Sequence, residues 1–286
     1  MGDGLRGSVC REGGRGVYGR PPRRLLIETA VSHLALSTHI HAEATVRQSA
    51  VAGTRPGKGR LIAWLVLVGV LAGLAFAANS LVAQETPTRG YGGQVTRYDD
   101  SFYRFSLGVV VIVQDAIILG LVLLIARGLP RRETFALYRP PSWPRTIGLV
   151  LGTLVTTYVV VVLLANAIGS GAQPDQGMPL FWDGSRGAQF AFNLVVIAAF
   201  VPVVEELTFR GLGFTLLSRF GPAAALVGTA VLFGLVHGFL LALPIFVAFG
   251  LALGTLRMRT GSVYPGMLLH GTINTIATIL AVTLGP

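Results

Sequence analysis

The sequence predicts an all-α, polytopic membrane protein with about seven transmembrane helices and a core bundle that carries the chemistry. Only 13% of its 286 residues are charged, 52% are hydrophobic, and the mean hydropathy is +0.65. A soluble domain carries about 25% charged residues, so roughly half of the usual charge is missing. Several apolar runs reach the ~20 residues that a helix needs to cross a ~30 Å hydrocarbon layer, and their continuity favours helices over a β-barrel.

The expected spans follow the apolar runs in order. They cover about 61–82, 106–126, 147–168, 187–217, 222–236, 240–256 and 263–284. The first run is longer than the ~7–15 apolar residues of a signal peptide, so we interpret it as a retained helix. Only Gly238 and Pro244 separate the fifth run from the sixth, which leaves that boundary poorly defined.

Residues 1–60 are interpreted as a basic, disordered extension, because they hold ten basic and four acidic side chains and are rich in Gly, Arg and Pro. The alternatives are a biological start near Val51 and an Arg-rich transit peptide, against which the acidic residues argue. Residues 61–144 would then supply N-terminal helices and loops, and residues 145–286 the catalytic membrane domain. A single cysteine, Cys10, excludes an internal disulfide.

The net charge of +10 does not indicate nucleic acid, because of where the charges lie. Outside the extension, most basic residues fall in alternate short loops, the pattern that orients membrane helices. The loop 127–146 has five Arg and one Glu, and segments 210–221 and 257–261 have two Arg each. Seven spans and a cytoplasmic N-terminus place all these loops in the cytoplasm. We therefore expect a multi-pass plasma-membrane protein that has the lipid bilayer, and no nucleic acid, as partner.

Two acidic residues and an arginine interrupt the fourth apolar run, in the stretch VVEELTFRG. A charge near the bilayer centre costs ~2.5–3.5 kcal/mol on insertion scales, and such residues usually face the bundle interior or a wet cavity. Glu206 and Arg210 are four residues apart on one helical face and can pair, whereas Glu205 has no partner in its own segment. Alternatively, all three mark the cytoplasmic end of the span, although apolar residues resume beyond Arg210.

The membrane domain has two histidines, His237 and His270, both in or at the ends of apolar spans. Phe233 precedes His237 by four residues and Asn274 follows His270 by four, so each pair shares a helical face. A lone histidine in an apolar helix is most often a packed residue with one hydrogen bond, but two beside a buried Glu pair indicate a site. Asp115, in the second span, is interpreted as a polar contact in the bundle interior or at the membrane interface.

These side chains suit the hydrolysis of an amide inside a membrane. A glutamate beside an imidazole can turn water into a nucleophile, and imidazole and carboxamide N–H groups can stabilise the resulting oxyanion. The same set could instead hold zinc through the two histidines and a glutamate, with a metal-bound water as nucleophile. Buried ionisable groups would also suit a transporter or proton relay. The candidate metal ligands are Glu205, Glu206, His237 and His270.

Three motifs resemble those of the CAAX protease and bacteriocin-processing (CPBP or Abi) family of intramembrane endopeptidases, which includes the type II CAAX prenyl proteases. EELTFR (205–210), FGLVH (233–237) and HGTIN (270–274) match the patterns EExxxR, FxxxH and HxxxN, in order, within residues 145–284. The sequence has no HExxH motif of a zinc protease and no GxSG motif of a rhomboid. A non-catalytic immunity or secretion partner of the same fold is the alternative, which a missing motif residue would have favoured.

The resemblance implies an intramembrane endopeptidase acting on a peptide or protein substrate, and a role for each motif residue. Glu205 would be the general base and would work with His237 to activate water. His270 and Asn274 would line the oxyanion site. The other motif residues would support these four, namely Glu206, Arg210 and Phe233. We favour a mechanism that requires no metal, with zinc as the alternative, and we expect the four catalytic side chains to converge on one cavity open to water.

Overall fold

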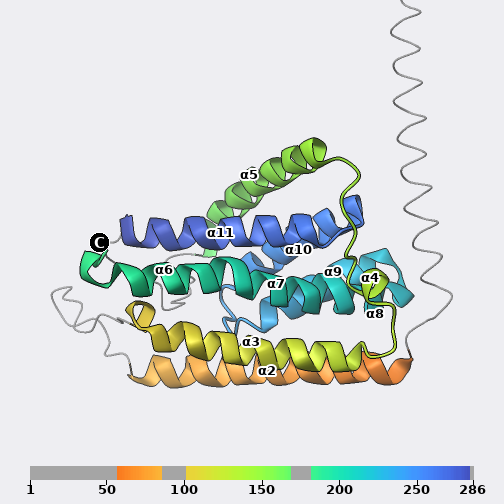
Figure 1. Cartoon of the computed structure of the whole chain (residues 1–286), viewed down its shortest axis with the longest axis horizontal. Coiled ribbons are helices and arrows are strands. Elements are labelled where there is room, and N and C mark those ends of the chain that lie inside the picture. Colours follow the sequence, from red (N-terminus) through yellow and green to blue (C-terminus); the bar gives the residue numbers. More distant parts are fainter. Residues whose placement is uncertain (1–56, 86–100, 169–181, 284–286) are drawn as a thin grey trace, which may run out of the picture. The chain divides into compact units, whose positions relative to one another are not determined.

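The computed structural model describes residues 57–85, 101–168 and 182–283, and all regular elements within these ranges are helices (Figure 1). The all-α expectation is confirmed for this part of the chain. Contacts divide the chain into two units, Met1–Ala50 and Val51–Pro286, and the described residues belong to the second. Most of the expected N-terminal extension lies outside the described residues, so its interpretation stays a prediction.

Six helical segments are long and apolar enough to cross a membrane, so the chain is a multi-pass membrane protein. They are α2 (Lys58–Glu85), α3 (Phe105–Ile125), α5 (Trp143–Ile168), the continuous segment Gly184–Phe220, α10 (Leu243–Thr260) and α11 (Tyr264–Thr283). The short helices η2 (Ser101–Tyr103) and α4 (Arg131–Thr134) lie in the connections. Most large exposed side chains on α2, α3 and α5 are Leu, Ile or Val, as lipid-facing surfaces require.

The fifth apolar run differs from the others because it forms a short helix. The helix α9 (Pro222–Leu235) has 14 residues, or about 21 Å, which is less than the ~30 Å hydrocarbon layer. It packs along α10, and residues 236–242 connect the two. Pro222 and Pro244 stand in the first turns of their helices, where a missing N–H breaks no helical bond. Helices α9 and α10 therefore form a hairpin in which α9 is too short to cross the hydrocarbon layer by itself.

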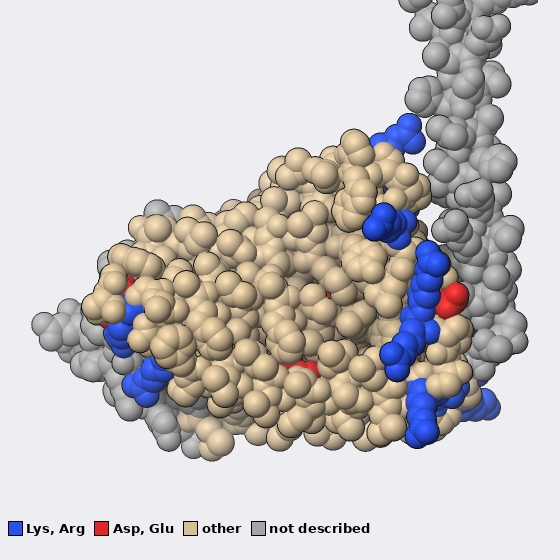
Figure 2. Space-filling model, viewed as in Figure 1, with Lys and Arg blue, Asp and Glu red and all other residues tan. Residues whose placement is uncertain are grey.

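Basic side chains gather at one end of the helices, where Figure 2 shows them as a band. The exposed basic residues of this band come from the start of α2, the connection between α3 and α5, and the end of α10. They are Lys58, Arg127, Arg131, Arg132, Arg139, Arg145 and Arg259. The shortness of α9 does not change which end of the bundle carries the basic residues. The α9–α10 hairpin starts and finishes at the same end, so the residues before α9 and after α10 both lie there.

The segment 184–220 is one helical rod interrupted twice by π-helix. It consists of η4 (Gly184–Arg186), α6 (Gly187–Val195), the π-helix η5 (Val196–Phe200), α7 (Val201–Glu206), the π-helix η6 (Leu207–Gly213), α8 (Phe214–Leu217) and η7 (Ser218–Phe220). Because π-helical turns are rare and occur often at functional sites, their position on both sides of Glu205 and Glu206 draws attention to α7.

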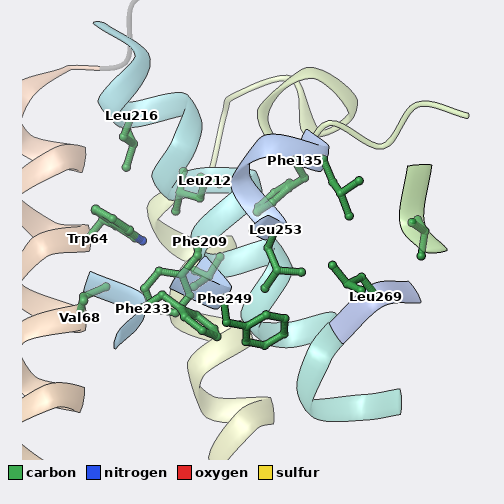
Figure 3. Close-up of a cluster of buried hydrophobic side chains, with 14 residues drawn as sticks. Trp64, Val68, Phe135, Phe209, Leu212, Leu216, Phe233, Phe249, Leu253 and Leu269 are labelled. Atoms are coloured by element: carbon green, nitrogen blue, oxygen red, sulfur yellow. The ribbon is translucent and has the colours of Figure 1, made fainter. Parts of the chain in front are cut away.

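The main apolar core surrounds η6 and joins it to α2, α9, α10 and α11 (Figure 3). Trp64 of α2 is fully buried, and its ring meets Phe209 edge-on with 6.3 Å between centroids. Its Nε1 donates a hydrogen bond to the Thr208 carbonyl at 3.1 Å. Gly213 lies against the same ring, where any Cβ would collide. Trp64 thus docks α2 onto the π-helix that follows the glutamates.

Replacing Trp64 with Ala should lower the free energy of unfolding by about 3–5 kcal/mol, because a fully buried aromatic side chain is removed. The measurement is thermal denaturation of the purified protein in detergent. The control is Ile62→Ala on the same helix, since the Ile62 side chain is 60% exposed and faces outward. Equal melting temperatures for the two variants would contradict the docking of α2 through Trp64.

Candidate active site

Glu205 and Glu206 end α7, and their surroundings differ. The Glu206 side chain is 0% exposed, whereas that of Glu205 is 25% exposed. Consecutive helical residues point in directions about 100° apart, so one carboxylate enters the bundle while the other lies at its margin. Of the two acids, Glu205 is the one that is partly exposed.

Arg210 pairs with Glu206, as their spacing predicts. Its Nη1 donates to Glu206 Oε1 at 3.0 Å, and both side chains are fully buried. Its Nη2 donates to the Gly250 carbonyl of α10 at 2.9 Å, and its guanidinium lies 4.4 Å above the Phe233 ring of α9. A buried ion pair is weak evidence for stability, because desolvation opposes the attraction. Its effect here is positional, since one cation contacts three helical segments.

His270 of α11 lies between the two glutamates. Its Nε2 is 3.6 Å from Glu205 Oε2, and its Nδ1 is 3.5 Å from Glu206 Oε1. The rings of Phe233 and Phe249 meet it edge-on, with centroids 5.8 and 5.1 Å away. Glu205 Oε2, Glu206 Oε2 and His270 Nδ1 are buried and have no hydrogen-bond partner within the part of the chain that the structure describes. Because buried polar atoms normally have one, these atoms are available to a water molecule or a substrate group.

Two glycines let α11 approach the helix that carries the acids. A Cβ on Gly266 would lie 2.5 Å from Glu206 Oε2, and one on Gly271 would collide with the Ala198 carbonyl of η5. Only glycine leaves room at both contacts. The position of His270 between the glutamates therefore depends on the residues that flank it on α11.

Asn274 donates a hydrogen bond in place of a backbone N–H that is missing at Pro202. In the π register of η5, Val201 N–H bonds to the carbonyl five residues earlier. The next residue, Pro202, has no N–H, so the Ile197 carbonyl loses its partner. Asn274 Nδ2 donates to that carbonyl at 3.0 Å. The amide is thus turned towards η5, one helical turn beyond His270.

His237 lies in the turn that follows α9. Its Nδ1 is 2.7 Å from the Phe233 carbonyl, and because a carbonyl only accepts, Nδ1 carries the hydrogen and Nε2 of the neutral ring is the acceptor. The ring stacks on Phe246 at 4.1 Å between centroids. Among the described residues no hydrogen bond or ion pair joins His237 to a glutamate. Phe233 connects the two histidines, since its ring meets both edge-on.

The predicted residues therefore do not all meet directly. The structure brings together Glu205, Glu206, Arg210 and His270, with Phe233 beside them. His237 joins this cluster through the Phe233 ring, and Asn274 reaches it through α11. The imidazole in contact with Glu205 is that of His270, whereas the family resemblance pairs Glu205 with His237.

The four candidate zinc ligands do not converge in the structure. Within the described ranges no group of three or more His, Cys, Asp or Glu side chains could hold a metal ion. Of the four candidate ligands, Glu206 bonds to Arg210 through Oε1, and His237 contacts the Phe233 and Phe246 rings rather than a glutamate. The Glu205 and His270 pair alone supplies fewer ligands than the three that a catalytic zinc normally has.

Sequence reasoning missed the residues that support the site from neighbouring positions. Pro202 and Gly266 carried a usable signal, because each lies close to a motif and breaks the apolar pattern of its helix. Asp115 of α3 is 5% exposed, and α3 packs on α7. Its Oδ2 is buried and has no hydrogen-bond partner among the described residues. The interpretation as a polar group inside the bundle fits this position.

Comparison with known proteins identifies one family. Residues 187–276 match the family model described as type II CAAX prenyl endopeptidase Rce1-like. The matched segment is less than half of the chain, begins with α6, and contains all three motifs. No curated protein and no solved structure matches the chain.

Replacing Asn274 with Leu should destabilise the protein, and the loss should shrink when Pro202→Ala restores an N–H for the Ile197 carbonyl. The expected coupling between the two substitutions is about 1 kcal/mol, the net worth of one hydrogen bond. Denaturation of wild type, both single variants and the double variant in detergent measures it. Thr272→Val serves as a control, because the Thr272 hydroxyl bonds within its own helix. Strictly additive effects would refute the exchange of donors.

Proposed function

We propose that this chain, which belongs to the CAAX protease family through residues 187–276, is an intramembrane endopeptidase in which Glu205 activates the attacking water. Family membership supports proteolysis of a peptide or protein substrate in general. The observation that favours Glu205 as the base is the contrast between two adjacent acids. Glu206 is fully buried and neutralised by Arg210, whereas Glu205 is 25% exposed and lies 3.6 Å from an imidazole.

In the proposed reaction a water molecule lies beside the Glu205 carboxylate. Glu205 takes one proton from this water while the water oxygen attacks the carbonyl carbon of the scissile bond. The tetrahedral oxyanion then collapses, the carbon–nitrogen bond breaks, and Glu205 returns its proton to the leaving amine. The Nε2 atom of His237, the acceptor nitrogen of its neutral ring, accepts a hydrogen bond from the second hydrogen of the same water. No metal is required for these steps.

Asn274 and His270 stabilise the oxyanion in this proposal. Asn274 has two amide hydrogens, and since one bonds to the Ile197 carbonyl, the second can donate to the developing charge. His270 holds Glu205 in place before the reaction. Once Glu205 has taken a proton it attracts the imidazole less, so the His270 Nε2–H can donate to the oxyanion instead.

The basic band suggests how the enzyme sits in its membrane. We infer that this end of the bundle faces the cytoplasm of a plasma-membrane protein, because loops on that side carry an excess of Lys and Arg. The α2 helix begins at this end with Lys58, which makes the N-terminal side cytoplasmic as well. Substrate would then reach Glu205 from the membrane or from the cytoplasmic face.

Glu205→Gln and His270→Ala should each lower the rate of peptide hydrolysis by about 10²–10⁴-fold, the usual contribution of a general base and its partner. Reconstituted protein is assayed with a panel of prenylated and unprenylated peptides. Glu133→Gln in α4 is the matched control, since it removes one carboxylate away from the site. If both site variants remain folded and cleave as fast as wild type, Glu205 is not the base.

A chelator such as EDTA should leave the hydrolysis rate unchanged, because no step assigned to the residues of this site uses a metal. A known zinc protease in the same buffer and detergent shows that the chelator is effective. Loss of activity that added Zn²⁺ restores would overturn the metal-free mechanism, and Glu205 would then become a candidate ligand.

A further inference from the structure

The helix α2 lies outside the matched segment 187–276, yet it contacts two of the three motif segments. Near one end, Trp64 donates to the Thr208 carbonyl of η6. Near the other end, Asn79 Nδ2 donates to the His237 carbonyl at 3.1 Å. The two side chains are 15 positions apart, or about 22 Å along the helix. A single helix therefore connects the segment that follows the glutamates to the turn that carries His237.

We propose that Asn79 is a positioning residue of the protease, which acts by holding the backbone of the turn that carries His237. The inference rests on the proposed function of His237, because the Asn79 side chain donates a hydrogen bond to the His237 backbone. It adds α2 to the elements that support catalysis, although none of the three motifs lies in this helix.

The turn needs such a donor because of where it lies. Residues 236–242 are not helical and follow a helix too short to cross the hydrocarbon layer, so their backbone polar groups lack helical partners and must find others. Three N–H groups of the turn have them. Val236 N–H bonds to the Leu232 carbonyl at 3.2 Å, His237 N–H to the Gly234 carbonyl at 3.3 Å, and Gly238 N–H to the Leu235 carbonyl at 3.0 Å. The His237 carbonyl accepts a hydrogen bond from Asn79 Nδ2.

Gly238 shows that the turn is seated directly on α2. Its φ is +73°, in the left-handed region that favours glycine. A Cβ at this position would lie 2.6 Å from the Ala75 carbonyl carbon and 2.7 Å from Asn79 Nδ2. Backbone thus rests on backbone, with the Asn79 amide beside the contact.

This seat determines where the His237 ring can be. The ring bonds to the Phe233 carbonyl of α9 and stacks on Phe246 of α10, while its backbone is held by α2. If Asn79 no longer donates, the turn can move away from α2 and carry Nε2 with it. A misplacement of about 1 Å is enough to lower a catalytic rate by up to ~100-fold.

The kinetic test compares Asn79→Leu, which has a similar size and no donor, with Ser80→Ala. Ser80 is the exposed neighbour, and its hydroxyl bonds to Phe76 within α2. We expect Asn79→Leu to lower kcat about 10- to 100-fold with KM changed less than about twofold, and Ser80→Ala to match wild type. A wild-type kcat for Asn79→Leu would overturn the proposal. If this variant does not accumulate in membranes, Asn79→Ala is measured with the same expectation.

A second arm separates positioning from simple destabilisation. In a His237→Ala background, adding Asn79→Leu should change the residual rate by less than about twofold, because both substitutions remove the same contribution. A full further loss would overturn the proposal.

A third arm does not depend on catalysis. With isotope-labelled histidine, the NMR signals of the His237 ring should shift or broaden in Asn79→Leu while those of His270 remain. An unchanged His237 signal would overturn the positioning role even if proteolysis is established. Absence of hydrolysis by wild type would instead count against the proposed function, and the spectra would still decide whether Asn79 holds the turn.

Discussion

The arrangement of this site depends on the buried pair of Arg210 and Glu206. Removing one partner of such a pair typically costs 3–5 kcal/mol, because the other is left as an uncompensated charge. The buried guanidinium is compensated by contacts to three helices at once. It contacts α7 through Glu206, α9 through the Phe233 ring and α10 through the Gly250 carbonyl. Glu206 is thereby committed to a structural task. The adjacent Glu205, which points elsewhere, forms no ion pair with Arg210 and is partly exposed.

The helix that carries the acids is also tied to its neighbours by its own backbone. In the two π-helical turns, carbonyl groups accept hydrogen bonds from side chains of other helices. Ile197 accepts from Asn274 of α11, Thr208 from Trp64 of α2, and Arg210 from Arg257 Nε of α10 at 3.2 Å. The π-helical turns thus leave backbone carbonyls free to accept hydrogen bonds from neighbouring helices. In a regular α-helix these carbonyls would accept from N–H groups of the same helix.

Sequence alone predicted the features that depend on local spacing. The apolar runs predict the helices, and the four-residue interval predicts the pairing of Glu206 with Arg210 because both lie on one helical face. Sequence did not reveal that His270 is the imidazole nearest Glu205, or that Asn274 turns towards Ile197. Those contacts link residues 65 and 77 positions apart, so they depend on which helices pack together and how closely. Glycine contacts such as that of Gly266 decide this, and no short-range pattern encodes them.

The contacts of α2 change what counts as the smallest working unit of this protein. Similarity to the family delimits residues 187–276, and a truncated or chimeric protein designed on those limits would retain every motif residue. It would lack Trp64 and Asn79, and with them the surface on which the His237 turn rests. A design that moves residues 187–276 into another scaffold would therefore also have to include α2 to keep this surface.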